Sequence, residues 1–134
     1  MKSLAPTLDR KTLLSTLWIF VIFNYLYCDV VGLMDANLLS QFLTGDVGGM
    51  KITETFLLIA GILMEVSIAL VLLSRILPQR SNRWANLFGG ALSTAAMVAT
   101  LFTGFTSYYL FFAVIEISTT VYIFWLAWTW KKPA

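Results

Sequence analysis

The stretch FLLIAGILMEVSIALVLL at residues 56–73 decides the fold of this chain. It is long enough to cross a bilayer, because a membrane-spanning helix needs roughly 20 mostly apolar residues. Near its centre stands Glu65, and a second apolar run, YYLFFAVIEISTTVYIF at residues 108–124, carries Glu116 in the same way. Aligned without gaps, MEVS around Glu65 falls on IEIS around Glu116, which suggests an internal repeat. Carboxylates at this depth are costly unless they face protein, water or a ligand, so both are candidate site residues.

Composition places the chain among membrane proteins. Its 134 residues are 59% hydrophobic, with a mean hydropathy of +0.82, whereas about half of a soluble domain is apolar. Four apolar stretches predict membrane spans, at residues 13–33, 54–76, 84–103 and 107–130. None of them shows the period-two polarity of a transmembrane barrel, and helices satisfy every backbone group in lipid. The predicted fold class is all-α, a single four-transmembrane-helix bundle over residues 1–134.

Basic residues gather on one side of these spans. They precede the first span, separate the second from the third, and follow the fourth: Lys2, Arg10, Lys11, Arg75, Arg80, Arg83, Lys131 and Lys132. On the other side, the first connection holds one basic residue, Lys51, against Asp35 and Asp46, and the second connection holds no charge. By the positive-inside rule both termini are cytoplasmic. The net charge of +2 reflects this bias and gives no reason to expect a nucleic-acid partner. The first span has no small-x-small cleavage pattern before Asp35, which argues against a signal peptide.

The first external connection, residues 34–53, is too long for a turn between packed helices, which takes about 2 to 8 residues. It predicts a short interfacial helix that Asp35 caps and Gly45 ends. The apolar edge of this helix consists of Leu38, Leu39, Phe42 and Leu43. Gly48-Gly49 predicts a turn, and Thr53 a cap for the second span. Two roles stay open for the segment, a spacer in the headgroup layer or a lid over the bundle.

The candidate site lies in the outer half of the bundle. The outer half of the first span is too polar to face lipid, so its polar side chains should face inward. Steps of three and four place Glu54 and Glu65 on one stripe of the second span, and Tyr109 near Glu116 on the fourth. The inner half is comparatively dry. The candidate ligand-binding residues are Glu65, Glu116, Asp29, Asn24, Tyr25 and Tyr109.

The third span predicts a packing helix, because small residues at regular spacing let membrane helices approach closely. Its surface of Gly90, Ser93 and Ala96 is the basis for the hypothesis that the protein forms homo-oligomers. Residues 78–82 predict a polar turn before this helix, and Thr7, after Pro6, predicts the cap of the first helix. Trp18 is expected near the inner interface, where tryptophan anchors membrane helices.

Four segments carry a family resemblance: FNYLYCD at 23–29, TGDVGG at 44–49, RWAN at 83–86 and YYLFFAVIE at 108–116. Together they resemble a family of small bacterial membrane proteins described only as a domain of unknown function. The resemblance spans nearly the whole chain. It implies a bacterial inner-membrane protein of four helices, and it implies no activity. More loosely, four spans with buried acids are similar in architecture to DoxX-like proteins and to the sterol-isomerase and sigma-2 receptor group, although fold does not imply function.

An acidic cavity with aromatic walls and no Lys, Arg or His inside the membrane favours a small cationic or amphiphilic ligand. The protein would bind or transport this ligand, and its acids could exchange protons for the cation. The alternative is a structural or assembly subunit in which protonated Glu65 and Glu116 join helices. A third hypothesis is a lipid-modifying, isomerase-like enzyme in which a carboxylic acid and Tyr25 or Tyr109 shift a proton.

Catalysis is the least favoured of these hypotheses, and no catalytic residue, metal ligand or cofactor is expected. The chain contains no histidine, which excludes Ser-His and Cys-His catalysis and the di-iron sites of helical bundles. The acids do not have the spacing of a Ca²⁺ or Mg²⁺ loop. The glycine pairs match no phosphate-binding pattern. Cys28 is the one cysteine, so the chain has no internal disulfide, and a buried packing role is expected for it.

Overall fold

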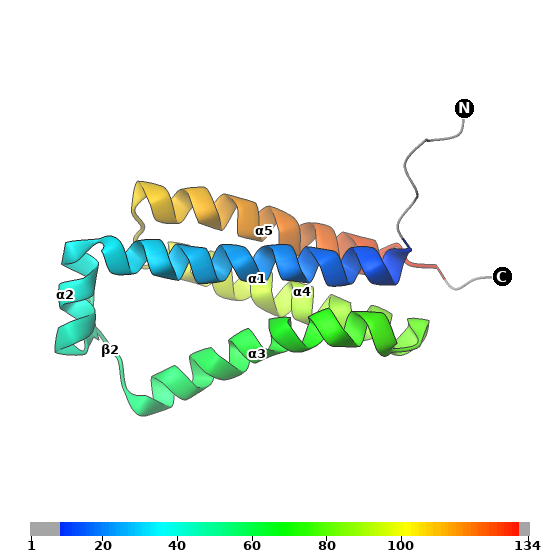
Figure 1. Cartoon of the computed structure of the whole chain (residues 1–134), viewed down its shortest axis with the longest axis horizontal. Coiled ribbons are helices and arrows are strands. Elements are labelled where there is room, and N and C mark those ends of the chain that lie inside the picture. The colour runs from blue at the N-terminus through cyan, green and yellow to red at the C-terminus, as the bar shows by residue number, and fades with distance from the viewer. Residues whose placement is uncertain (1–8, 132–134) are drawn as a thin grey trace.

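The structure is a computed structural model and describes residues 9–131, so the cap predicted at Thr7 lies outside the described residues. Its elements in chain order are α1 (Arg10–Met34), α2 (Ala36–Thr44), β1 (Asp46–Val47), β2 (Met50–Lys51), α3 (Glu54–Ile76), α4 (Gln79–Leu101) and α5 (Ser107–Trp128) (Figure 1). Four helices, α1, α3, α4 and α5, are long and apolar enough to cross a membrane. The predicted fold class, an all-α bundle of four transmembrane helices, is confirmed.

The long helices form a four-membered ring. α1 packs against α3 and α5, and α4 packs against the same two helices. The start of α1, the turn between α3 and α4, and the end of α5 lie together at one end of the bundle, which we call the terminal end (Figure 1). α2 and the β1–β2 hairpin lie at the opposite end, which we call the α2 end. An even number of spans thus brings both ends of the described chain to one side.

The segment between the first two spans folds as its sequence predicts. Asp35 caps α2 with its carboxylate, and Gly45 ends the helix in the left-handed conformation with φ of 77°. Gly48 and Gly49 also have positive φ, of 59° and 88°, at the turn between β1 and β2. The Thr53 hydroxyl accepts the hydrogen bond of a free N–H at the start of α3. Each of these residues was expected in its role because turn and cap chemistry is local.

α4 begins earlier than the sequence predicts, and the polar turn expected at residues 78–82 is wrong. Pro78 is the N-cap, and the helix starts at Gln79. The polar residues form its first turn because their side chains satisfy backbone groups: Asn82 is fully buried and donates to the carbonyl of Ser74 at 2.7 Å. The side chain thereby closes the α3–α4 corner, where a helix end leaves carbonyls unpaired.

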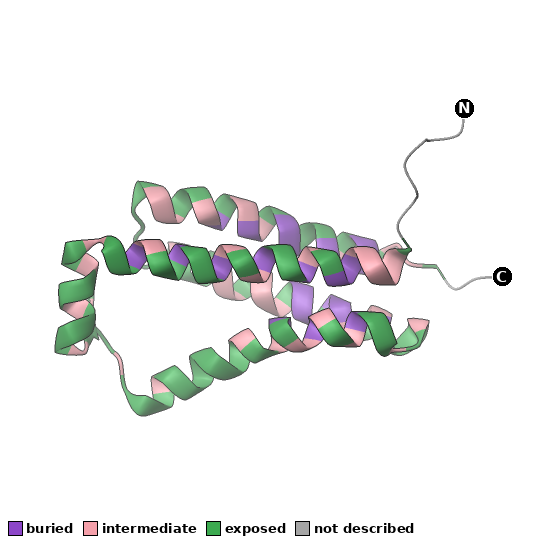
Figure 2. Ribbon diagram, viewed as in Figure 1, coloured by how far each residue is buried: buried purple, intermediate pink, exposed green. Residues whose placement is uncertain are grey.

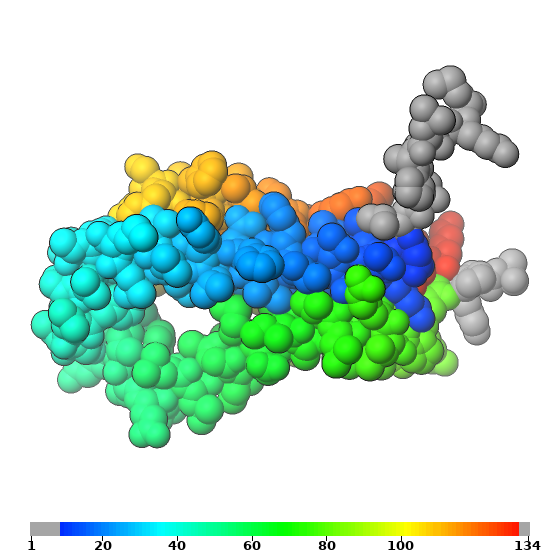
Figure 3. Space-filling view, in the orientation of Figure 1, coloured from blue at the N-terminus to red at the C-terminus, as the bar shows by residue number. Residues whose placement is uncertain are grey.

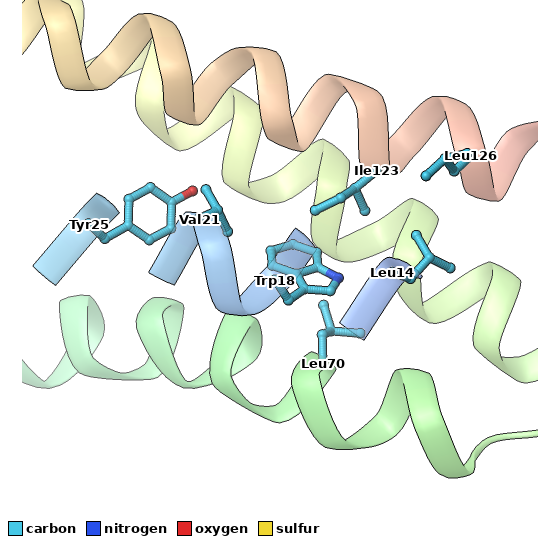
Figure 4. Packing of buried hydrophobic residues seen from close by; sticks show 7 residues of the cluster. All are labelled: Leu14, Trp18, Val21, Tyr25, Leu70, Ile123 and Leu126. Carbon is cyan, nitrogen blue, oxygen red and sulfur yellow. The ribbon is translucent and has the colours of Figure 1, made fainter. Parts of the chain in front are cut away.

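Buried residues gather in the half of the bundle nearer the terminal end (Figure 2). The cluster in Figure 4 joins α1, α3 and α5, and consists of Leu14, Trp18, Val21, Tyr25, Leu70, Ile123 and Leu126. Trp18 is completely buried and packs inside this cluster. The first half of α3, by contrast, diverges from α1, and the space-filling view shows an opening between them (Figure 3). α3 is the least buried of the four spans.

A buried polar network runs through the terminal half, so the expectation that this half is dry is also wrong. The side-chain oxygen of Asn86, Oδ1, accepts from the Trp18 indole N–H at 2.7 Å. The Asn86 amide nitrogen donates to Asn82 Oδ1 at 2.7 Å and to Ser74 Oγ at 3.2 Å. Asn82, Asn86 and Ser74 are fully buried. In lipid a polar group needs a protein partner, and these groups supply partners to one another.

Small residues on α4 bring it close to its neighbours, as predicted for a packing helix. A Cβ at Gly89 would overlap Leu70 Cδ1 and lie 3.2 Å from the Trp18 ring. A Cβ at Gly90 would lie 3.2 Å from the Thr120 carbonyl oxygen on α5. Gly90 is therefore buried inside the bundle, whereas Ser93 and Ala96 are half-buried and line a cavity between α3 and α4. The surface predicted for self-association is thus partly occupied by contacts within the protein.

Candidate functional site

A cavity of about 650 Å³ lies at the α2 end, between the last turns of α1, α2, the hairpin and the α4–α5 connection. Two carboxylates line it, those of Asp29 and Asp35. Aromatic rings line it from α2, α5 and the α4–α5 connection: Phe42, Phe105, Tyr108 and Tyr109. No Lys or Arg is among its described lining residues. The walls between the polar groups are apolar and include Leu33, Leu38, Val47 and Met50.

Asp29 and Tyr109 are the two predicted site residues that line this cavity. Asp29 is exposed, and within residues 9–131 its carboxylate takes part in no hydrogen bond. Tyr109 is half-buried on the first turn of α5, and its hydroxyl donates to Thr100 Oγ1 at 2.7 Å. Asp29 therefore presents to the cavity a carboxyl group that no described residue engages, while Tyr109 is held in place at the same cavity.

Asp35 is held by three donors at the same cavity. Its Oδ1 accepts from the backbone N–H groups of Asn37 and Leu38 at 3.1 and 3.4 Å. Its Oδ2 accepts from the Tyr108 hydroxyl at 2.9 Å. The Tyr108 hydrogen bond, with that of Leu38, holds the pKa of Asp35 below its ordinary value. The sequence predicts the cap at Asp35 but not its bond to Tyr108, because the two residues are 73 positions apart.

Glu116 lies deeper, on the inner face of α5, and is only 1% exposed. Its Oε1 has no hydrogen-bond partner among the described residues. The Tyr25 hydroxyl, on α1, is buried and equally without a partner there. Ser93 lies near this hydroxyl, but the two groups do not reach hydrogen-bond geometry. The carboxyl of Glu116 interacts electrostatically with Asp29 and Tyr25. Glu116 and Tyr25 therefore face inward, as predicted.

A second cavity of about 180 Å³ lies between α3 and α4, against α1. It is lined by Tyr25, Ser67, Ser93 and apolar side chains. The two serine hydroxyls lie 3.4 Å apart. Ala60 and Leu63, which line it from α3, are exposed, so this space is open at its edge.

Glu65 does not belong to this site, and the prediction that it faces the bundle axis is wrong. The predicted stripe consists of Glu54, Leu58, Gly61, Glu65 and Ala69, of which the first four are exposed and Ala69 is half-buried. α3 instead buries the face of Ser67, Leu70 and Ser74. Because α3 is apolar on all sides, periodicity shows which residues share a face but not which face packs inward. Glu65 and Glu116 therefore make no contact of the kind expected for helix association.

Asn24 also lies outside the cavity at the α2 end. It is half-buried, and its side-chain amide donates to the carbonyl of Phe20 on its own helix at 2.9 Å. It lines neither of the two cavities. The expectation that Asn24 and Asp29 share one cavity is wrong, because the turn that separates them along α1 places Asn24 at a different depth and angle.

The described residues contain no group of three or more His, Cys, Asp or Glu side chains placed to hold a metal ion. Cys28 is buried and lines the cavity beside Asp29. The chemistry available to the site is thus that of carboxylates, phenols and aromatic faces.

Comparison with curated proteins and with solved structures gives no match. The looser architectural similarity to DoxX-like proteins and to the sterol-isomerase group therefore stays a prediction. A family model does match, and it covers residues 1–134. The resemblance seen in the sequence segments is confirmed: the chain belongs to DUF6326, a family of unknown function.

Proposed function

We propose that this protein binds a small cationic or amphiphilic ligand in the cavity at the α2 end. The observation that carries the proposal is the composition of this cavity, which joins two carboxylates and four aromatic rings and has no basic residue among its described lining. Its volume of about 650 Å³ falls within the usual range for small-molecule sites, about 300 to 1,000 Å³. A cation would meet negative charge and aromatic faces together.

Asp29 is the residue that would contact the charged group of the ligand. The oxygens of Asp35 are already engaged by Tyr108 and by the first turn of α2, whereas Asp29 has no hydrogen bond among the described residues. A cation over an aromatic face adds about 0.5 to 2 kcal/mol, depending on how far it is desolvated. Apolar walls next to the acids would accommodate the hydrophobic part of an amphiphile.

We further propose that the protein spans the bacterial inner membrane with its terminal end in the cytoplasm. Arg10, Arg75 and Arg83 stand at the terminal end, and the positive-inside rule favours this orientation. The cavity would then open to the outside. The terminal half is closed by the core around Trp18, which supports binding from the α2 end and would require a rearrangement for transport.

Binding of benzyltrimethylammonium to the purified protein in lipid nanodiscs tests the proposal. This probe combines a permanent positive charge with an aromatic ring, and equilibrium dialysis of the labelled compound measures its Kd. Wild-type protein should bind it, whereas Asp29→Asn should weaken binding by about tenfold or more, because a hydrogen bond or contact to a charged group contributes about 1.5 to 3 kcal/mol.

Glu54→Gln is the matched control, since Glu54 is an exposed acid at the same end of the bundle that does not line the cavity. This variant should keep the wild-type Kd. The uncharged carbon isostere, neopentylbenzene, should not compete with the probe. Equal losses in both variants, or competition by the isostere, would contradict a cation site at Asp29.

A structural or assembly role is the second candidate function, and the exposed position of Glu65 favours it. A carboxyl on the membrane-facing side of a helix is costly unless another protein covers it. The two roles use opposite sides of the bundle, so one protein could have both.

A further inference from the structure

Two buried polar groups below the cavity lack partners within residues 9–131. They are Glu116 Oε1 on α5 and the Tyr25 hydroxyl on α1. Glu116 is 1% exposed, and Tyr25 is 9% exposed. Buried polar side chains in proteins are nearly always hydrogen-bonded, so an unpaired carboxyl oxygen and an unpaired phenol within one bundle require a reason. Tyr25 lines the smaller cavity between α3 and α4. Glu116 interacts electrostatically with Asp29, which lines the ligand cavity.

The surroundings of Glu116 contain acids and phenols and no base. From α1, the titratable groups that face it are Tyr25, Cys28 and Asp29. Its own helix adds Tyr109. α4 presents no titratable group at this depth, and the acids of α3 lie on its exposed side. The described basic side chains of the long helices all stand at the terminal end: Arg10, Lys11, Arg75, Arg80 and Arg83.

The carboxyls of Asp29 and Glu116 interact electrostatically, and no cation lies beside them among the described residues. Ionising both inside the bundle would therefore cost free energy, because like charges repel and burial disfavours charge. Asp29 is exposed to the cavity and Glu116 is buried, so the neutral form is favoured at Glu116. A cation that enters beside Asp29 changes this balance, because it supplies the positive charge that a second carboxylate needs.

This inference rests on the proposed function. We infer that Glu116 is the proton-exchange group of the cavity and that one proton leaves its carboxyl when one monovalent cation binds. In the empty protein the O–H bond of Glu116 is intact. On binding, this bond breaks, the electron pair stays on the carboxylate, and the proton passes to water through the cavity. One positive charge enters and one leaves, so the net charge of the site does not change.

The pH dependence of benzyltrimethylammonium binding tests this coupling, because the probe has no exchangeable proton and any dependence must come from the protein. Below the pH at which Glu116 loses its proton, the Kd of the wild type should fall about tenfold for each unit of rising pH. Glu116→Gln removes the proton but keeps a similar shape. This variant should bind with a Kd that is independent of pH over the same range.

Measuring the number of protons released on binding tests the coupling in the wild type, without the Glu116→Gln variant. Saturation of the wild type with the probe in weak buffer should release about one proton for each bound cation, as linkage requires for a fully coupled site. Tyr25→Phe, which keeps the ring and removes the hydroxyl, should leave this count unchanged. Glu54→Gln, which changes an exposed acid, should also leave it unchanged.

Binding without proton release, or a Glu116→Gln variant with the wild-type pH dependence, would overturn the inference while leaving the cation site intact. Absence of binding to the wild type at every pH would overturn the proposed function and this inference with it. Loss of coupling in Asp29→Asn with retention in Glu116→Gln would assign the proton to Asp29 and contradict the role given to Glu116.

Discussion

Asp35 joins α2 to α5 through a single carboxylate. One oxygen caps the first turn of α2, and the other accepts from Tyr108 on the first turn of α5. The Tyr108 bond is the main cause of the lowered pKa of Asp35. A carboxyl with a lowered pKa in the folded state adds stability above its unfolded pKa of about 3.9, and this stability is lost as the pH falls through the lower folded value.

Tyr108→Phe should therefore raise the pKa of Asp35 toward its ordinary value, because the strongest donor to the carboxylate is removed. Carbon-13 NMR of the aspartate carboxyls in micelles measures this pKa directly. Tyr122→Phe removes an exposed hydroxyl from the same helix and should have no effect on it. An unchanged Asp35 titration in Tyr108→Phe would show that the hydrogen bond is absent in solution.

Among single residues, the sequence predicted part of the candidate site. Asp29 and Glu116 were found because an acid inside an apolar run is conspicuous whichever way it faces. Glu65 was found by the same reasoning but faces outward, and no local pattern separates it from Glu116. The amides of Asn82 and Asn86 were missed because uncharged polar residues in a membrane helix give a weaker signal than acids do.

The packing of α4 depends on the absence of a side chain at Gly89. A Cβ there would overlap Leu70 on α3 and come within 3.2 Å of the Trp18 ring on α1. Gly89→Ala should lower the free energy of unfolding by about 1 to 3 kcal/mol, the usual range for an overpacked core. Reversible unfolding in mixed detergent micelles measures the loss.

Leu70→Ala provides the control for this prediction because it removes the atom that the new methyl group would meet. Gly89→Ala should cost clearly less in the Leu70→Ala background than in the wild type. Additive effects of the two substitutions would indicate that the two sites are not in contact, contrary to the structure.

For whole elements, prediction succeeded where the determining chemistry is local. α2 follows from Asp35 and Gly45, and α3 from an apolar run with Thr53 as its cap. The start of α4 was missed because the polar residues from Gln79 to Asn82 are typical of a turn. The Asn82 side chain bonds to the carbonyls of the α3–α4 corner, a contact that forms only when both helices are in place.

At the scale of the whole molecule, the sequence predicted the number of spans but not their order around the ring. That order places Asp29 of α1 and Tyr109 of α5 on one cavity, with Glu116 of α5 buried below it, and turns the Glu65 face of α3 away from it. The volume between helices is set by side chains from distant segments, so the separation of a dense terminal half from an open α2 end was not visible in the sequence.

Contact with a second copy of the chain would explain why Glu65 lies on the outward face of α3. Glu65 is exposed within a membrane helix, and Gly61, one turn away, has open space around its Cα. A two-fold axis along the membrane normal would place each residue of this stripe against its own copy. The two Glu65 side chains would then face each other and could hydrogen-bond across the helix contact.

We therefore expect a parallel homodimer through α3, which cysteine cross-linking in native membranes can detect. In a Cys28→Ser background, Leu58→Cys should form a disulfide-linked dimer, whereas Phe111→Cys on α5, with the same 63% exposure, should not. Glu65→Leu should reduce the Leu58→Cys product severalfold, since a hydrogen bond between membrane helices contributes about 1 kcal/mol. Glu65→Gln should retain it because an amide also donates and accepts. Equal cross-linking at Leu58→Cys and Phe111→Cys would contradict the dimer. So would a Leu58→Cys product whose yield Glu65→Leu does not change.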